Sequence, residues 1–223
     1  MSSIFEWDWS AADREFNRAI ALAPSYSCAH EDRAVFLTMI GRRSEALAEI
    51  AKIEQLDYSF SAAHTESAVY YELRDYPRLI EASKRGLLWD PNDWFQHYSL
   101  GVGYEGTGKV QEAIEEYQKA IQISNGSQRP IVALAHAYAA QGKKAEAEKL
   151  LRNLERRSKA TASPYTMATI YAGLGETDLA FDYLGRAYSQ RSFDILALNS
   201  DFLLDSLRPD NRFQQLVRRI GLH

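Results

Sequence analysis

The chain has 223 residues, of which 46% are hydrophobic, 12% aromatic and 25% charged, with a formal net charge of −4 and one cysteine. Apolar content this high excludes a disordered chain, and a single thiol excludes a disulfide-stapled scaffold. The acidic balance argues against nucleic acid or an anionic membrane as partner. No apolar run approaches the roughly 20 residues that cross a bilayer, and the N-terminus lacks the features of a signal peptide. We therefore expect a cytoplasmic protein.

Similar residues recur along the chain every 33 or 34 positions, and the low count of 12 Gly and 6 Pro favours helices between them. The clearest series of mostly small residues is Ala12, Ala46, Leu79, Ala113, Ala147 and Ala180. Large residues precede the last five members: Leu37, Tyr70, Tyr104, Tyr138 and Tyr171. A fixed period of this length is typical of a solenoid built from helix pairs.

The chain begins with half a unit, residues 8–26, which supplies one helix over 8–22 without a partner helix. Phe5, Trp7 and Trp9 stand at its start. Either these aromatic residues cover the open end of the stack, or the chain is a fragment of something longer.

Five complete units follow, each predicted to be two antiparallel helices, at about 27–59, 60–93, 94–127, 128–160 and 161–192. In the clearest unit, Gly101 and Tyr104 share one face of the first helix, and Tyr117 lies on the facing helix. Gly108 is expected to end the first helix in a left-handed conformation. We expect the 60–93 unit to be the loosest, since Ser83 and Gly86 replace larger residues there.

Residues 193–223 lack the repeat spacing but are rich in Leu, Phe and Ile. A solenoid needs a terminal element over its last repeat, so this segment is predicted to be a C-terminal helical cap.

The pattern resembles the tetratricopeptide repeat, whose 34-residue helix–turn–helix signature is matched best over 100–120. The resemblance covers residues 8 to about 192 and implies an all-α, right-handed solenoid over 1–192. It also implies a concave groove lined by the first helices, in which exposed aromatic residues would bind a peptide or protein partner. The alternative is that some of these tyrosines pack between adjacent units. The residues predicted to bind this partner are Glu31, His64, Tyr71, Phe95, Tyr98, Glu105, Arg129, His136 and Tyr165. The Lys and Asn clamp with which some family members hold a C-terminal carboxylate is absent, so such a ligand is disfavoured.

The segments 7–16 and 207–222 also look like parts of the C-terminal repeat regions of bacterial multidomain regulators. That resemblance implies a sensory or regulatory half of a larger protein, with a homodimer as one of its forms.

The sequence contains three patterns that carry chemistry in other proteins. Gly101–Gly106 matches G-x-G-x-x-G, but a phosphate loop needs a preceding strand, and the residues before it read as helix. The histidines lack metal-ligand spacing and have no cysteine beside them. The stretch 143–159 holds seven basic and three acidic residues, which is typical of a solvated face and is alternatively a docking patch for an acidic partner. We therefore predict a non-catalytic protein-interaction module without metal or cofactor; the alternative is the regulatory half described above.

Overall fold

The computed structural model describes residues 8–56, 59–158 and 161–222, and within these ranges the regular structure is helical throughout. The predicted all-α solenoid is confirmed. Ten-residue to fifteen-residue α-helices make up most of it, together with two 3₁₀ helices near the C-terminus. In chain order the helices are α2 Trp9–Leu22, α3 Ser27–Met39, α4 Arg43–Leu56, α5 Phe60–Glu72, α6 Tyr76–Trp89, α7 Trp94–Gly106, α8 Val110–Ile123, α9 Gln128–Ala140, α10 Lys144–Ser158, α11 Pro164–Gly173, α12 Thr177–Ser189, η1 Phe193–Asn199, η2 Phe202–Leu207 and α13 Asn211–Ile220.

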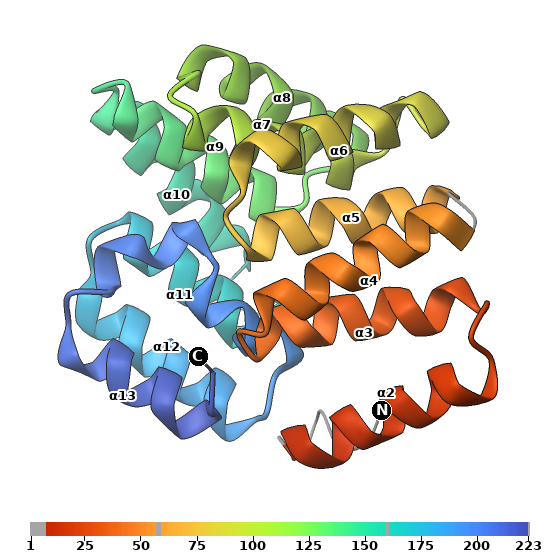
Figure 1. Cartoon of the computed structure of the whole chain (residues 1–223). Helices are drawn as coiled ribbons and strands as arrows, with labels where there is room; N and C mark the ends of the chain where they lie inside the picture. The colour runs from red at the N-terminus through yellow and green to blue at the C-terminus, as the bar shows by residue number, and fades with distance from the viewer. Residues whose placement is uncertain (1–7, 57–58, 159–160, 223) are drawn as a thin grey trace.

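The helices pair as neighbours in sequence and stack in chain order, and the stack curves round so that α12 and α13 return to the same side of the molecule as α2 (Figure 1). Small residues let paired helices approach: a Cβ added to Gly101 in α7 would lie 2.5 Å from the ring of Tyr117 in α8. Gly103 is packed as closely against Ile80 of α6. The glycine-rich stretch is therefore the interior of a helix, which removes the phosphate-loop interpretation.

Each first helix ends in a left-handed residue at the same place in the repeat. Gly41, Gly108, Gly142 and Gly175 have φ between 74° and 81°, a conformation that glycine adopts without a Cβ clash. In the 60–93 unit the position is taken by Arg74, with φ 53°. This conformation costs a non-glycine residue about 1–2 kcal/mol, so the arginine side chain must offset that cost through its contacts.

The 60–93 unit keeps its packing in spite of its small residues. A Cβ on Gly86 would lie 2.5 Å from the side chain of Gln96, which fills the space above it. Gln96 accepts a hydrogen bond from Ser67 at 2.8 Å and donates one to the carbonyl of Ala63 at 3.3 Å. A polar side chain from the next unit thus replaces the apolar bulk whose absence led us to expect a loose unit.

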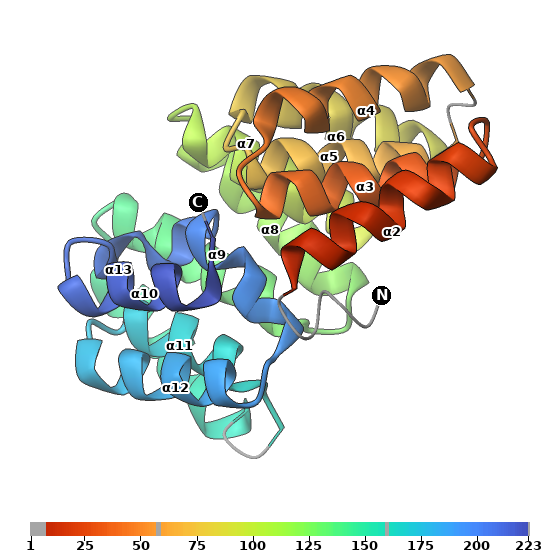
Figure 2. The same ribbon diagram turned by 60° about the horizontal axis from the view of Figure 1, so that its bottom comes forward.

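The C-terminal residues after α12 contact two different parts of the stack. The apolar face of α13, made by Phe213, Leu216, Val217 and Ile220, is buried, and α13 packs against α12. Residues 193–207, called here the C-terminal segment, contain η1 and η2 and lie against α9, α11 and α12. This segment therefore runs along the inner side of the stack as well as covering its end (Figure 2).

The two ends of the described chain also touch. Trp9 at the start of α2 donates a hydrogen bond through Nε1 to the carbonyl of Ile220, at 3.2 Å. A Cβ on Gly221, which has φ 77°, would lie 2.9 Å from that indole nitrogen. Trp9 thus covers the last helix, whereas Phe5 and Trp7, which were expected to act with it, lie outside the described residues.

Candidate functional site

The inner, concave side of the stack is formed by the first helices α3, α5, α7, α9 and α11, and consecutive members of this series contact each other. Arg129, near the start of α9, stands in the middle of this side. Its guanidinium lies over the rings of Tyr71 and Tyr98, 5.5 and 5.6 Å from their centres. It also donates hydrogen bonds to the hydroxyls of both tyrosines, at 2.7 and 3.0 Å.

This cluster holds a carboxylate of the chain itself. Asp201, between η1 and η2, is fully buried, and its Oδ2 accepts hydrogen bonds from Arg129 at 3.2 Å and from Tyr165 at 3.1 Å. Its Oδ1 accepts from the hydroxyl of Tyr71 at 3.3 Å and from the backbone N–H of Leu203. Four donors from α5, α9, α11 and η2 therefore fix one acidic side chain of the C-terminal segment.

The prediction that the groove tyrosines are exposed is wrong. Tyr98 and Tyr165 are 1% exposed and Tyr71 is 7% exposed. The physical reason is the C-terminal segment, which covers them and supplies Asp201 as a hydrogen-bond partner. Burial raises the pKa of Tyr71 and of Tyr165 well above the usual range, so both phenols are neutral and donate to Asp201.

The acidic residues expected in the groove are bound within the chain. Glu31 is buried and accepts hydrogen bonds from Ser27, at 2.7 Å, and from Ser61. Glu105 accepts from Tyr117 at 2.8 Å and pairs with Nδ1 of His136 at 2.6 Å. The hydrogen bond to Glu105 raises the pKa of His136 above its ordinary value.

His64 and Phe95, from successive first helices, lie together on the concave side. Their rings stack with centres 4.8 Å apart, and His64 also pairs with Asp93. Burial of Asp93 opposes its ionisation, but hydrogen bonds from His64 and from two backbone N–H groups lower its pKa below the usual range. Phe95 is half-buried, so its ring keeps an accessible edge.

A pocket of about 240 Å³ opens beside the C-terminal segment, and we call it the concave pocket. Its walls come from four first helices and from η1. It is lined by Met39, Ala68, Tyr71, Glu72, Trp94, Phe95, Tyr98, Arg129, Phe193, Asp194 and Ala197. Trp94 and Phe193 are exposed large hydrophobic residues at 36% and 53%. A mostly apolar pocket that also contains a few ionisable groups suits an apolar side chain of a ligand.

The concave pocket contains Tyr71, Phe95, Tyr98 and Arg129 of the predicted set. Glu31, His64, Glu105, His136 and Tyr165 are not among its lining residues. Sequence reasoning missed Glu72, Trp94 and the whole of η1. A signal for the C-terminal segment was present, because Asp201 interrupts an apolar run and a buried acid requires a cationic partner.

His30 and His97 stand at the same repeat position and make the same contacts. In each, Nδ1 lies 2.6 Å from a glutamate of the second helix, Glu49 or Glu116, and Nε2 lies 3.0 Å from the carbonyl of the proline six residues earlier. Both rings are buried and tie a helix pair to the preceding loop. Across the described ranges no group of three or more His, Cys, Asp or Glu side chains is arranged to hold a metal ion.

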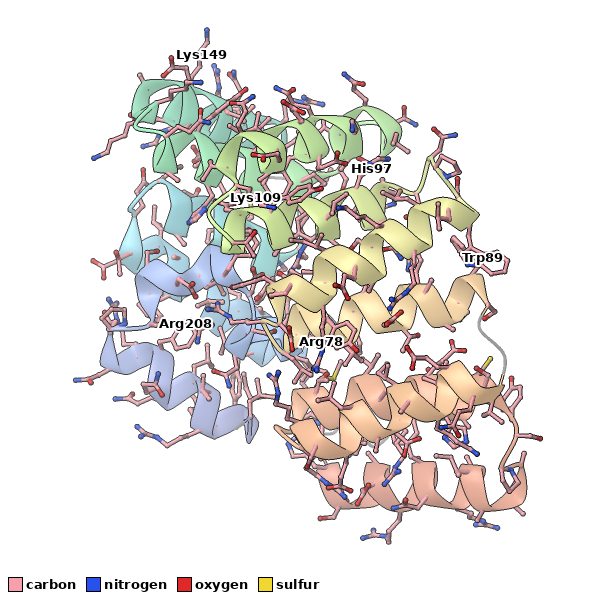
Figure 3. All side chains as sticks on the ribbon, turned by 45° about the horizontal axis from the view of Figure 1, so that its top comes forward. Arg78, Trp89, His97, Lys109, Lys149 and Arg208 are labelled. Carbon is pink, nitrogen blue, oxygen red and sulfur yellow. The ribbon has the colours of Figure 1, made fainter. Side chains whose placement is uncertain are left out.

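The basic helix α10 faces outward, and Lys149 points away from the stack (Figure 3). Arg152 of this helix donates to Glu176 at 2.5 Å and to Glu155 at 3.3 Å, so part of its charge is compensated. Lys159 lies outside the described residues, and the docking patch for an acidic partner stays a prediction. None of the described helices combines the length and apolarity needed to cross a membrane.

Comparison with known proteins finds similar sequences and similar structures. The family model for the tetratricopeptide repeat matches residues 106–169. The chain is 30% identical over 83 residues to the Hsp70-Hsp90 organizing protein of Triticum aestivum, which covers 37% of this chain and 14% of that protein. The chain thus spans about one-seventh of the length of that relative.

Two solved structures show the same fold at low sequence identity. The crystal structure of MamA superposes with a TM-score of 0.59 at 22% identity, covering 72% of this chain and 96% of MamA. YrrB, a TPR protein with an unusual peptide-binding site, superposes with a TM-score of 0.52 at 19% identity, covering 83% and 96%. The family match identifies residues 106–169 as tetratricopeptide repeat sequence. The 33- to 34-residue spacing, the stacked helix pairs and these two structures show that the described chain has the fold of tetratricopeptide repeat proteins.

Proposed function

We propose that this chain is a non-catalytic interaction module whose concave pocket binds an apolar or aromatic side chain of a peptide or protein partner. The observation that carries the proposal is the pocket itself, which has a volume of about 240 Å³ and is lined by Trp94, Phe95 and Phe193 among others. Aromatic side chains on rigid helices are the usual anchors of such sites, since little conformational entropy is lost on binding. The peptide-binding site described for YrrB, a protein of this fold, supports the same kind of use.

A partner would bind beside the C-terminal segment and not in its place. Ile195, Leu198, Leu203, Leu204 and Leu207 of this segment are each no more than 4% exposed. Burying one such side chain stabilises the fold by about 1.5–3 kcal/mol, so removing all five would cost on the order of 10 kcal/mol. A partner peptide would have to supply that free energy before gaining any affinity.

The test blocks the concave pocket with a long side chain. Peptides are first selected from a random phage-displayed library on the wild-type protein, and their dissociation constants are then measured for two variants. Ala68→Arg places a guanidinium in the pocket, and Ala140→Arg adds the same side chain at an exposed residue of α9 that is not among the residues lining the pocket. We expect A68R to weaken binding at least about tenfold, or 1.4 kcal/mol, and A140R to leave it unchanged. Failure to select any peptide, or equal affinity for A68R, would contradict the proposal.

A further inference from the structure

The concave pocket carries more acidic than basic charge. Besides its neutral phenols, its ionisable lining residues are Glu72, Asp194 and Arg129. The positive charge of Arg129 already has a partner, since one of its nitrogens lies 3.2 Å from the carboxylate of Asp201. These two charges compensate each other, and the carboxyls of Glu72 and Asp194 make the rest of the pocket lining acidic.

The two carboxyls reach the pocket from different elements. Glu72 stands at the end of α5 and accepts a hydrogen bond from Ser200. Asp194 is an exposed residue of η1 and accepts one from Ser163 at 3.0 Å. A serine hydroxyl carries no charge, and each carboxylate has further lone pairs. Within the described ranges neither carboxyl forms an ion pair with a lysine or an arginine, so both can accept from a cation that a ligand brings.

Aromatic rings stand beside these carboxyls. Trp94 and Phe193 keep exposed ring surface, and the ring of Phe95 meets Trp94 edge-on, with centres 6.2 Å apart. The pocket already contains one cation on its rings, because the guanidinium of Arg129 lies over two tyrosines. A cation over an aromatic face gains about 0.5–1 kcal/mol at exposed sites. Lysine and arginine also have apolar stems that can lie along such rings.

We propose that the concave pocket selects a partner segment in which a lysine or an arginine stands beside the apolar anchor, with its cation held by Glu72 and Asp194 and its stem against the exposed rings. This inference rests on the proposed function, and it adds the charge of the ligand to that function. An acidic residue beside the anchor would meet two like charges, so acidic segments are rejected.

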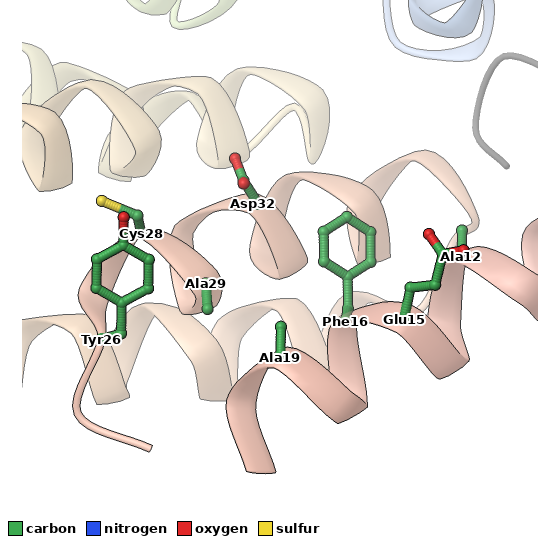
Figure 4. Close-up of a pocket in the computed structure, with 8 residues that line it drawn as sticks. All are labelled: Ala12, Glu15, Phe16, Ala19, Tyr26, Cys28, Ala29 and Asp32. Atoms are coloured by element: carbon green, nitrogen blue, oxygen red, sulfur yellow. The ribbon is translucent and has the colours of Figure 1, made fainter. Parts of the chain in front are cut away.

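Carboxylates also line a second pocket, which supplies a matched control. This pocket has a volume of about 340 Å³ and lies between α2 and α3. Figure 4 shows its two carboxylates, Glu15 on α2 and Asp32 on α3. Both residues are exposed, so their replacement removes the same amount of charge from the protein with little effect on packing.

The test measures how the charge beside an apolar anchor changes affinity. The probes are three acetylated peptide amides of sequence Gly-X-Leu-X-Gly, in which X is lysine, glutamine or glutamate. Their dissociation constants are measured by NMR titration, which reaches the range of about 10 mM. We expect the wild type to bind the lysine peptide about fivefold more tightly than the glutamine peptide, since a partly exposed ion pair and a cation on a ring each add under about 1 kcal/mol. The glutamate peptide should bind most weakly.

Two double variants locate the cation. Glu72→Gln with Asp194→Asn removes the carboxylates of the concave pocket, and Glu15→Gln with Asp32→Asn removes those of the second pocket. We expect the first double variant to lose the preference for lysine over glutamine and the second to keep it. Circular dichroism checks that both are folded. Because Asp194 is exposed, D194N alone should also be folded and should reduce the preference about twofold, half of the effect of a paired charge.

The affinity for the lysine peptide should also rise with pH. Burial raises the pKa of Glu72 to about 7, against the hydrogen bond from Ser200. Of the charged groups that act on Glu72, Arg129 and Arg74 favour its ionisation and Asp201 opposes it. The ionised fraction of Glu72 therefore grows from pH 6 to pH 8, while the lysines of the peptide stay charged. We expect the lysine peptide to bind about threefold more tightly at pH 8, and E72Q to abolish this change.

The outcomes separate this inference from the proposed function. Equal affinity for the three peptides, tightest binding of the glutamate peptide, no binding of the lysine peptide up to about 10 mM, or an equal loss of preference in both double variants would overturn it. Peptides selected from the random library that lose affinity for A68R but contain no excess of lysine or arginine would also overturn it, while leaving the proposed function intact.

Discussion

Asp201 links three inner helices, because its carboxylate accepts hydrogen bonds from residues of α5, α9 and α11. It has no solvent exposure, and its charge is met by Arg129, whose side chain is 33% exposed. The phenols of Tyr71 and Tyr165 complete its hydrogen bonds. A buried carboxylate is tolerated only with such partners, because an unpaired charge in the interior is strongly unfavourable.

Replacing this carboxylate should therefore destabilise the fold. We expect Asp201→Asn to lower the free energy of unfolding by about 3 kcal/mol, at the low end for breaking a buried ion pair because Arg129 is partly exposed. Asp205→Asn in the same segment is the matched control: Asp205 pairs with Arg74 but is 43% exposed, so its loss should cost under about 1 kcal/mol. Urea unfolding of both variants measures the difference. An equal loss of unfolding free energy in the two variants would contradict this prediction.

Arg74 shows how far a single residue could be predicted. The repeat spacing locates the left-handed position correctly, since four of its five occupants are glycine. It does not explain the arginine, whose side chain donates to the carbonyl of Ser200 at 3.0 Å and to Asp205 at 3.1 Å. These partners lie more than 120 residues away in the sequence. Local patterns carry no information about such a pairing.

At the scale of elements, the C-terminal segment joins the inner helices through groups that respond to pH. Ser200 donates a hydrogen bond to Glu72 at the end of α5. Burial raises the pKa of Glu72 to about 7, although the hydrogen bond from Ser200 acts in the opposite direction. The folded protein therefore keeps a proton on Glu72 at pH values where the unfolded chain has released it.

This difference predicts the direction of a pH effect. The unfolded carboxyl titrates near 4.5 and the folded one near 7, so the stability contributed by protonated Glu72 is complete below about 4.5 and is lost as pH rises to 7. The loss should be about 1.4 kcal/mol for each unit by which the two pKa values differ. Glu72→Gln stays neutral and can keep the bond to Ser200, so its stability should fall less across this range. Parallel unfolding curves for wild type and E72Q from pH 4.5 to 8 would refute this assignment.

The helices themselves were largely predictable, because each is encoded locally. Gly41, Gly108, Gly142 and Gly175 mark the ends of first helices, and small residues facing aromatic rings mark the pairs. The course of residues 193–207 was not predictable in the same way. Its apolar pattern is compatible with burial over the last repeat or along the inner helices, and the observed course is fixed by the long-range contacts of Asp201.

At the scale of the whole molecule, the concave side is divided. The C-terminal segment occupies one part through its buried leucines and Asp201, and the concave pocket beside Trp94 and Phe95 is an open part. Contact between Trp9 and Ile220 ties the first described helix to the last. We therefore expect the protein to bind its partner as a rigid receptor, without displacement of its own C-terminal segment.

Hydrogen exchange followed by mass spectrometry tests this division most directly. The amides of 193–207 in the wild type are measured alone and with a peptide selected for binding, since protected amides report burial and local stability. We expect these amides to stay protected in both states, and the beginning of α7 around Trp94 and Phe95 to gain protection when the peptide is bound. Loss of protection in 193–207 on peptide binding would contradict it, because the segment would then be the element that a partner displaces.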